Sequence, residues 1–382
     1  MRVLLATTQF APEPGGVPRL LEQFCTHHPP GVEVAVLSVQ QQAPEFYRDY
    51  DTTARYPIER VHAASGKGAT SWLFARRLDA WVRRWRPDVV WSGVAYPTAI
   101  LTAGVAALHR VPFVVYAHSE DVTISGVRKR AALRWALKRA RRVAAPSHFT
   151  RKMLLDLGLS PARTKVIHPG MDLPVMEATP PPAWLAPLQD KWLLLTVARV
   201  VRRKGQDTVL RAMPQLMDTL PDLHYLIAGT GPDEAELQAL AHKLGVAEHV
   251  TFAGRVSDAD LAACYRACRV FVMATRPEEV VMDGEKRFEV EGFGITYLEA
   301  AAAGKPAIGS WAGGAAEAIV DGETGLLVEA EDVEALAAAV RHLAQDSGLA
   351  QRLGDAGRAR VYAHFTADAF AGQITALLEE VC

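Results

Sequence analysis

The sequence of 382 residues is long enough for two domains, because a domain commonly holds roughly 150 residues. Hydrophobic residues make up 49% of the chain and charged residues 22%, a balance that excludes a mostly disordered protein. The 42 Lys and Arg nearly equal the 43 Asp and Glu, so the formal net charge is −1 and nucleic acid is not expected as a partner. Four cysteines are too few for a disulfide scaffold, and we interpret Cys264 and Cys268 as packing residues of one helix face.

The first half of the chain alternates strand and helix signals. Residues 2–8 are a run of mostly Val, Leu and Ala without polar alternation, which is typical of a strand buried on both faces of a parallel sheet. A loop rich in Pro and Gly spans 9–16, and a helical pattern follows to residue 27. Further strands are expected at 32–38, 88–92, 112–117, 142–145 and 165–168, and helices at 72–86 and 127–140. This alternation predicts a doubly wound α/β domain.

A proline-rich stretch at 173–191 interrupts the alternation and is typical of a linker. The pattern restarts with a buried strand at 192–198. Later strands are expected at 223–228, 250–253, 270–273 and 306–309, helices at 206–219, 233–244, 257–267 and 296–303, and a hairpin at 324–328 before the final helices. Two Rossmann-like halves are therefore predicted. Ligands of such sheets bind at the carboxyl ends of the strands, so the site is expected between the halves.

A cluster of cations follows the strand at 192–198 directly. Arg199, Arg202, Arg203 and Lys204 precede Gly205, and a cluster of this kind at a strand's carboxyl end suits a diphosphate. The alternative interpretation is a solvated basic turn.

Two acids eight residues apart flank the start of a predicted helix. Glu291 precedes the turn Gly292–Gly294, and Glu299 lies inside the helix that follows. Glycines at a helix start leave N–H groups free for a ligand, and carboxylates bind sugar or ribose hydroxyls. The alternative is a capping acid and a surface glutamate.

His118 follows the strand at 112–117, with Glu120 and Asp121 beside it. A histidine at the carboxyl end of a strand is either a catalytic or substrate-orienting group or a structural residue. No Ser-His-Asp order, CxxC pair or HExxH motif stands out in the sequence. No set of metal ligands is visible, so no metal is expected.

Glycine pairs mark two further turns. Gly15 and Gly16 separate the first strand from the first helix, where the backbone can approach an anion closely. A G-x-G-x-x-G fingerprint is absent there, which argues against an NAD enzyme. Gly229 and Gly231 turn from strand to helix and either approach a nucleotide or simply form a tight turn.

Three segments bear on location. The apolar run 94–108 has about fifteen residues, fewer than the roughly 20 of a membrane span, and predicts a buried helix. No targeting segment is visible, so a cytoplasmic protein is expected. The basic run 128–142 is either a solvated helix or a face that docks on anionic lipid. The charged segment 276–290 is a lid, an acceptor wall or a plain loop.

The residues at 197–205 (VARVVRRKG) and 291–299 (EGFGITYLE) together resemble the retaining glycosyltransferases of family four. The E-x7-E signature is met by Glu291 and Glu299. The resemblance spans nearly the whole chain, and its motifs are specific in combination.

The resemblance implies a GT-B fold, in which two Rossmann-like domains face a deep cleft. It implies an acceptor-side domain at 1–172, a linker at 173–191 and a nucleotide-sugar-binding domain at 192–365. A C-terminal helix at 366–382 would cross back onto the first domain. It also implies a nucleotide-sugar donor as substrate and no obligatory metal or other cofactor.

The resemblance also implies a role for each matching residue. Arg199 and Lys204 would hold the donor diphosphate, and Gly16, with Gly15 beside it, would contact it from the other domain. Glu299 would bind the ribose, and His118 would line the reacting centre. The transferred sugar would be held by Glu291 together with the backbone of Gly292, Phe293, Gly294 and Ile295.

The stretches RRKGQDTVLRAMPQL and VEGFGITYLEA are similar to the mannosyltransferases that act on phosphatidylinositol mannosides. This favours GDP-mannose as donor and a hydroxyl acceptor on a glycolipid or polysaccharide precursor, at the inner face of a membrane. A UDP-glucose- or UDP-N-acetylglucosamine-dependent transferase is the alternative. An epimerase or phosphorylase of the same fold, and a non-catalytic sugar-nucleotide-binding subunit, are the competing classes.

Overall fold

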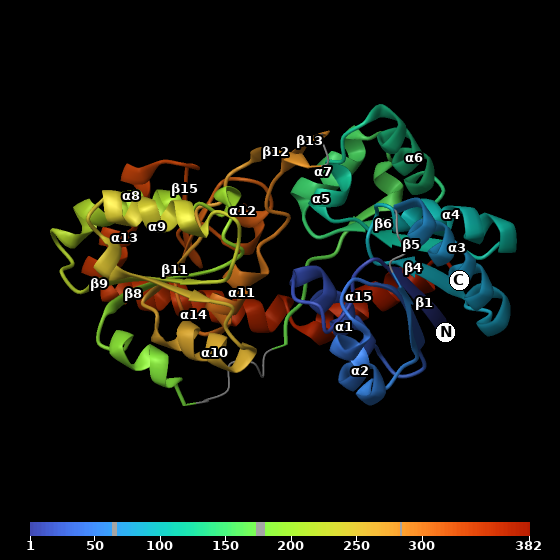
Figure 1. Ribbon diagram of the computed structural model, residues 1–382, viewed down its shortest axis with the longest axis horizontal. Helices are drawn as coiled ribbons and strands as arrows, with labels where there is room; N and C mark the ends of the chain where they lie inside the picture. The colour runs from blue at the N-terminus through green and yellow to red at the C-terminus, as the bar shows by residue number, and fades with distance from the viewer. Residues whose placement is uncertain (63–66, 173–179, 283–284) are drawn as a thin grey trace. The chain divides into compact units, whose positions relative to one another are not determined.

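The computed structural model describes residues 1–62, 67–172, 180–282 and 285–382 and divides into two compact units (Figure 1). Unit 1 comprises Met1–Gly170, Val280–Phe288 and Ala367–Cys382, and unit 2 comprises Met171–Glu279 and Glu289–Thr366. Among the described residues, no helix combines the length and the apolar character needed to cross a bilayer.

Unit 1 contains a seven-stranded parallel sheet in the order β3-β2-β1-β4-β5-β6-β7. Its strands are β1 (Arg2–Thr7), β2 (Glu33–Gln40), β3 (Ile58–His62), β4 (Val89–Ser92), β5 (Phe113–Tyr116), β6 (Arg142–Ala145) and β7 (Thr164–Val166). Leu5 of the central β1 pairs with Val36 on one side and Trp91 on the other. Because β1 has neighbours on both edges and helices on both faces, its residues from Val3 to Ala6 are apolar and buried, as the sequence predicts.

Helices cover both faces of this sheet. One face is packed by α3 (Lys67–Trp85), α4 (Thr98–His109), α6 (Val127–Leu137) and α7 (His148–Asp156), and the other by α1 (Gly16–His27) and α15 (Ala367–Glu379). The apolar run at 94–108 is confirmed as part of a packed helix, α4. The C-terminal helix α15 packs beside α1 and buries Phe370, Ile374 and Leu377 in unit 1.

Two elements of unit 1 escaped the sequence patterns. The helix α2 (Pro44–Thr53) buries only Tyr47, and β3 is an edge strand in which only Val61 is buried. Neither therefore shows the apolar periodicity on which sequence interpretation depends. The helix predicted at 127–140 ends at Leu137, and Arg142 belongs to β6.

Unit 2 contains a six-stranded parallel sheet in the order β10-β9-β8-β11-β14-β15. Its strands are β8 (Trp192–Val197), β9 (Leu223–Ala228), β10 (Val250–Gly254), β11 (Val270–Val272), β14 (Ala307–Ser310) and β15 (Gly325–Val328). The hairpin predicted at 324–328 is wrong. These residues form one strand, β15, which pairs in parallel with β14 so that Ala307 lies opposite Gly325.

The helices of unit 2 also form two layers. One face of the sheet is covered by α8 (Gln206–Met217), α9 (Glu234–Lys243) and α13 (Val333–Gln345), and the other by α10 (Asp258–Ala267), α11 (Ile295–Ala302) and α14 (Ser347–His364). Residues 173–179 of the predicted linker lie outside the described residues. Of its remainder, Leu185 and Leu188 are buried in the core of unit 2.

A two-stranded hairpin interrupts unit 2. Its strands are β12 (Glu278–Met282) and β13 (Glu285–Glu289), within the charged segment at 276–290. Residues 280–288 belong to unit 1, although the flanking chain belongs to unit 2. The sequence indicates only that this segment is charged.

Both sheets reverse their strand order beside their first strand. In unit 1 the reversal lies between β1 and β4, and in unit 2 between β8 and β11. The loops that leave such neighbouring strands diverge to opposite faces, which opens a crevice at the carboxyl edge of the sheet. The predicted site residues therefore need to be sought after these strands.

Gly205 is one of the most confined glycines at these edges. Its φ is +74°, and an added Cβ would lie 1.9 Å from the carbonyl oxygen of Ala274. We expect Gly205→Ala to lower the free energy of unfolding by at least about 2 kcal/mol, measured by urea denaturation. Gly245→Ala is the matched control, because Gly245 has a φ of +71° and no atom within 4 Å of the added Cβ. Equal losses in the two variants would contradict the close approach at Ala274.

Candidate active site

The basic loop of unit 2 follows β8 at the strand reversal. Lys204 ends the short helix Arg202–Lys204, and its Nζ donates a hydrogen bond to Oε2 of Glu291. Only 12% of either side chain is exposed. Arg199 is exposed, and its side chain has no hydrogen-bond or ion-pair partner among the residues described. The structure thus brings Lys204 and Glu291 together and leaves Arg199 accessible to an anion.

The Glu291 carboxyl is charged although it is buried. Burial alone would raise its pKa, but the nearby Lys204 and Arg203 outweigh burial and hold the pKa below its usual value. Nη1 of Arg203 lies 3.6 Å from Oε2 of Glu291. Glu291 is therefore an acceptor of hydrogen bonds rather than a proton donor at neutral pH.

Arg203 pairs with acids of the protein rather than facing an anionic ligand, as the sequence suggests it would. It was grouped with the cations that bind an anion, but its side chain is 8% exposed and is paired with two acids. Its Nε lies 3.2 Å from Oε2 of Glu289, in addition to the contact with Glu291. Arg203 therefore positions Glu291, and the sequence offers no signal that separates it from Arg202 beside it.

Glu299 lies on α11 and is buried. Its Oε2 accepts a hydrogen bond of 2.6 Å from the hydroxyl of Tyr265, which belongs to α10. Tyr265 was missed by sequence reasoning, because its position in a helical pattern is that of an ordinary core aromatic residue. The bond fixes the orientation of the carboxylate, and a carboxylate can accept further hydrogen bonds from hydroxyls.

The turn before α11 presents backbone rather than side chains. Phe293 is buried, with its ring centroid 5.7 Å from that of Phe365, so only its backbone is available to a ligand. The following Gly294 has a φ of +92°. On the other side of the turn, the N–H of Gly314 donates to the carbonyl oxygen of Glu291 at 2.8 Å. Glu291 is thus fixed at both its backbone and its carboxylate.

Gly229 and Gly231 have a packing explanation. An added Cβ at Gly229 would lie 1.9 Å from the carbonyl oxygen of Ala198, and one at Gly231 would lie 2.0 Å from that of Val200. The two glycines let the loop after β9 lie directly against the basic loop after β8. A contact of these glycines with a nucleotide stays a prediction.

In unit 1, His118 follows β5 at the carboxyl edge of the sheet. Its Nε2 lies 3.3 Å from the carbonyl oxygen of Gly93, which directly follows β4. Burial lowers the pKa of the imidazole to about 4, so His118 is neutral at physiological pH. Because the Gly93 carbonyl oxygen can only accept, the single N–H of the neutral ring lies on Nε2, and Nδ1 is an uncharged acceptor.

Asp121 joins the same two loops. Its Oδ2 accepts hydrogen bonds from the backbone N–H of Ala95 at 2.8 Å and of His118 at 3.2 Å. Burial raises the pKa of the Asp121 carboxyl to about 7. The sequence indicates Asp121 only as a neighbour of His118, whereas the structure makes it the group that holds the His118 backbone.

The glycine loop after β1 lies at the same edge. Gly15 has a φ of +137°, which favours glycine, and α1 begins at Gly16 without a side-chain cap. The first N–H groups of α1 are therefore open at the strand reversal of unit 1. Their contact with a phosphate stays a prediction.

Both halves of the chain match family models of glycosyltransferases. Residues 14–174 match the family model for Glycosyltransferase Family 4, and residues 185–360 match that for glycosyl transferases group 1. The chain is 32% identical over 364 residues to the GDP-mannose-dependent alpha-(1-6)-phosphatidylinositol monomannoside mannosyltransferase of Mycolicibacterium smegmatis, covering 93% of this chain and 92% of the relative. A corresponding monoacylated-substrate enzyme of Corynebacterium glutamicum is 28% identical over 385 residues, covering 99% and 98%.

Solved structures agree on the fold. The structure of Anabaena Alr3699/HepE in complex with UDP superposes with a TM-score of 0.82 at 19% identity, over 100% of both chains. Sucrose-phosphate synthase from Thermosynechococcus elongatus gives 0.75 at 23% identity, over 100% of this chain and 98% of that one.

Two Rossmann-like units with these loops define a GT-B glycosyltransferase, as the sequence predicted. The chain belongs to glycosyltransferase family 4 and is an enzyme that uses a nucleotide-sugar donor as substrate.

The pKa of Asp121 generates a pH prediction. Because the folded state holds a proton on this carboxyl between the ordinary value of 3.8 and about 7, its contribution to stability is full at low pH and is lost as the pH rises through 7. Asp121→Asn should remove this slope, which is at most about 1.4 kcal/mol per pH unit, while its side-chain oxygen still accepts both hydrogen bonds. Denaturant unfolding at pH 5, 6.5 and 8 measures it.

Glu45→Gln is the control for Asp121→Asn, because it removes an exposed carboxylate of unit 1 that has no part in raising the Asp121 pKa. The same pH profile in wild type and Asp121→Asn would contradict the raised pKa.

Proposed function

We propose that this glycosyltransferase transfers mannose from GDP-mannose to a hydroxyl of a lipid-linked acceptor, with retention of configuration at the anomeric carbon. The observation that carries the proposal is the 32% identity, over nearly the full length of both chains, to relatives named as GDP-mannose-dependent mannosyltransferases. The buried Lys204–Glu291 pair after β8 and β11 supplies the chemistry that such a transfer needs.

The reaction breaks the bond between the sugar and the diphosphate, so negative charge grows on the departing nucleotide. Lys204 and Arg199 neutralise that charge, and the open N–H groups at the start of α11 stabilise it further. Fixed cations of this kind take the place of a metal ion at the diphosphate, so we propose that transfer requires no added metal.

The donor's sugar and ribose meet the two acids. Glu291, which stays ionised, accepts hydrogen bonds from hydroxyls of the transferred sugar. Glu299, oriented by Tyr265, accepts from the ribose hydroxyls. The lowered pKa of Glu291 keeps it ionised, and therefore an acceptor, near neutral pH.

Unit 1 supplies the remaining groups. The neutral imidazole of His118 lies beside the reacting centre as a hydrogen-bond partner, and Gly15 and Gly16 allow the backbone to approach the diphosphate. Because the imidazole carries no positive charge, it does not compete with Lys204 and Arg199 for the anion.

A panel of four donors tests the proposal. GDP-mannose, UDP-glucose, UDP-N-acetylglucosamine and ADP-glucose are compared by thermal shift and by slow nucleotide release, in buffer with EDTA. We expect stabilisation and turnover with GDP-mannose alone. Preference for a UDP-sugar would assign the alternative donor, binding without turnover would indicate a non-catalytic subunit, and activity abolished by EDTA would contradict metal independence.

Lys204→Ala completes that panel. It should lower turnover of GDP-mannose about tenfold to a hundredfold, because leaving-group stabilisation is lost. Lys243→Ala, at an exposed lysine in the last turn of α9, is the matched control and should leave turnover unchanged.

The helix α6 carries the proposed contact with an anionic membrane. Its exposed residues include Arg128 and the apolar Val127 and Trp135, which are 86% and 40% exposed. The guanidinium of Arg139 stacks 4.3 Å from the Trp135 ring. Arg142, at the end of the basic run, is excluded from this face because it pairs with Glu380.

We expect α6 to direct the protein to vesicles that contain phosphatidylglycerol, because basic and apolar residues together favour an anionic interface. Cosedimentation should weaken as salt is raised from about 0.05 to 0.5 M, since screening shortens the reach of the charges. Equal binding to pure phosphatidylcholine vesicles would contradict the proposal.

A further inference from the structure

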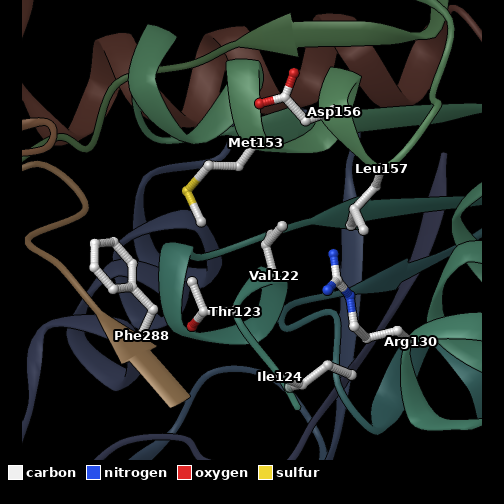
Figure 2. Close-up of a pocket in the computed structure, with 8 residues that line it drawn as sticks. All are labelled: Val122, Thr123, Ile124, Arg130, Met153, Asp156, Leu157 and Phe288. Carbon is white, nitrogen blue, oxygen red and sulfur yellow. The ribbon is translucent and has the colours of Figure 1, made fainter. Parts of the chain in front are cut away.

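Unit 1 contains a cavity of about 280 Å³ that none of the roles above uses (Figure 2). Its wall is mostly apolar, formed by Val122, Ile124, Met153, Leu157 and Phe288. Binding sites for whole small molecules commonly measure roughly 300–1,000 Å³, so this cavity suits one part of a ligand.

The cavity lies close along the chain to the predicted reacting centre. The short helix α5 (Ser119–Val122) starts directly after His118, and its last residue, Val122, forms part of the wall. Thr123 and Ile124 continue the wall beyond α5. A molecule that presents a hydroxyl near His118 therefore has this cavity within reach on the same unit.

Two charged residues line the cavity, Arg130 and Asp156. Arg130 of α6 is exposed, and within the described part of the chain its side chain makes no hydrogen bond or ion pair. Figure 2 shows its guanidinium directed toward Leu157 and Val122, whereas the carboxylate of Asp156 points away from Arg130. An anionic group on the ligand is therefore the natural partner for Arg130.

One wall comes from the hairpin β12–β13. Phe288 lies near the end of β13, is 48% exposed and belongs to the same unit as α5, α6 and α7. A half-exposed aromatic ring at the edge of an apolar cavity offers its face to a ligand, and covering it removes apolar area from water. Through Phe288, the charged segment at 276–290 thus forms one wall of the cavity.

We propose that this cavity is an acceptor subsite that receives an apolar chain or ring next to an anionic group, with Phe288 as its wall and Arg130 as the counter-charge. The proposal deepens the proposed function and rests on it for the existence of an acceptor. Phe288 and Arg130 are specificity-determining residues in this arrangement, and neither takes part in the transfer step.

Binding of three probes separates the two contacts. Octyl phosphate has a chain and a charge, octyl mannoside has the chain alone, and inorganic phosphate has the charge alone. Saturating GDP keeps the phosphates out of the donor site, and dissociation constants are measured by calorimetry. Octyl phosphate should bind wild type most tightly, because it makes both contacts.

Phe288→Ala should weaken binding of octyl phosphate and octyl mannoside about tenfold and leave that of inorganic phosphate unchanged, since only the two octyl probes lose an apolar contact with the ring. Val281→Ala is the matched control: Val281 lies on the same hairpin, is 68% exposed and does not line the cavity.

Arg130→Gln should weaken octyl phosphate about tenfold and leave octyl mannoside unchanged, since only the charged contact is removed. Arg48→Gln, at an exposed arginine of α2 outside the cavity, is its control. Thermal denaturation of each variant verifies folding.

Equal affinities for octyl phosphate in Phe288→Ala and Val281→Ala would overturn the subsite, and so would tighter binding of octylammonium than of octyl phosphate. Stabilisation by GDP-mannose, measured on the same variants, should be unaffected. If GDP-mannose still stabilises the variants but the variants bind the probes as tightly as wild type does, only the subsite is refuted. If GDP-mannose does not stabilise wild type, the proposed donor is refuted.

Discussion

The site of unit 2 depends on a lysine and a glutamate that are both withdrawn from water. Removing two charges from water costs several kcal/mol per ion, so such a pair needs further partners. Arg203 supplies a second cation for Glu291, and the N–H of Gly314 fixes the Glu291 backbone. The close approach at Gly205 fixes the lysine's loop against Ala274. The loops that follow the neighbouring strands β8 and β11 are thereby held together. In the function that we propose, the group that they receive is the donor diphosphate.

In unit 1 the loops after two neighbouring strands are joined by hydrogen bonds rather than by a charged pair. Asp121 accepts backbone N–H groups from the loops after β4 and β5, and His118 contacts the carbonyl of Gly93. Burial shifts both groups toward their neutral forms, because it lowers the pKa of the imidazole to about 4 and raises that of the carboxyl to about 7. In the mechanism that we propose, the cations that face the donor diphosphate therefore come from unit 2, and His118 of unit 1 carries no charge.

The sequence predicts most of the central strands, because a strand with neighbours on both edges and helices on both faces must be apolar throughout. It fails at the edges: β3 is half-exposed, and β15 follows a turn that resembles a hairpin connection. At the site, the pairing of Lys204 with Glu291 joins positions that only the order of strands brings together. Tyr265 is a different case, because nothing distinguishes a hydroxyl that orients a carboxylate from an ordinary core aromatic residue until Glu299 is placed beside it.

The path of the chain has a consequence for how this enzyme can be divided. The polypeptide passes from one unit to the other at 170–171, 279–280, 288–289 and 366–367, so neither unit is one continuous stretch. A fragment that stops before α15 would leave the apolar surface under Phe370 and Ile374 uncovered. Chimaeras that exchange unit 1 between relatives must therefore transplant three separate pieces together: the N-terminal half, the hairpin and the final helix. For the same reason, substitutions in α15 act on unit 1, although α15 follows unit 2 in the sequence.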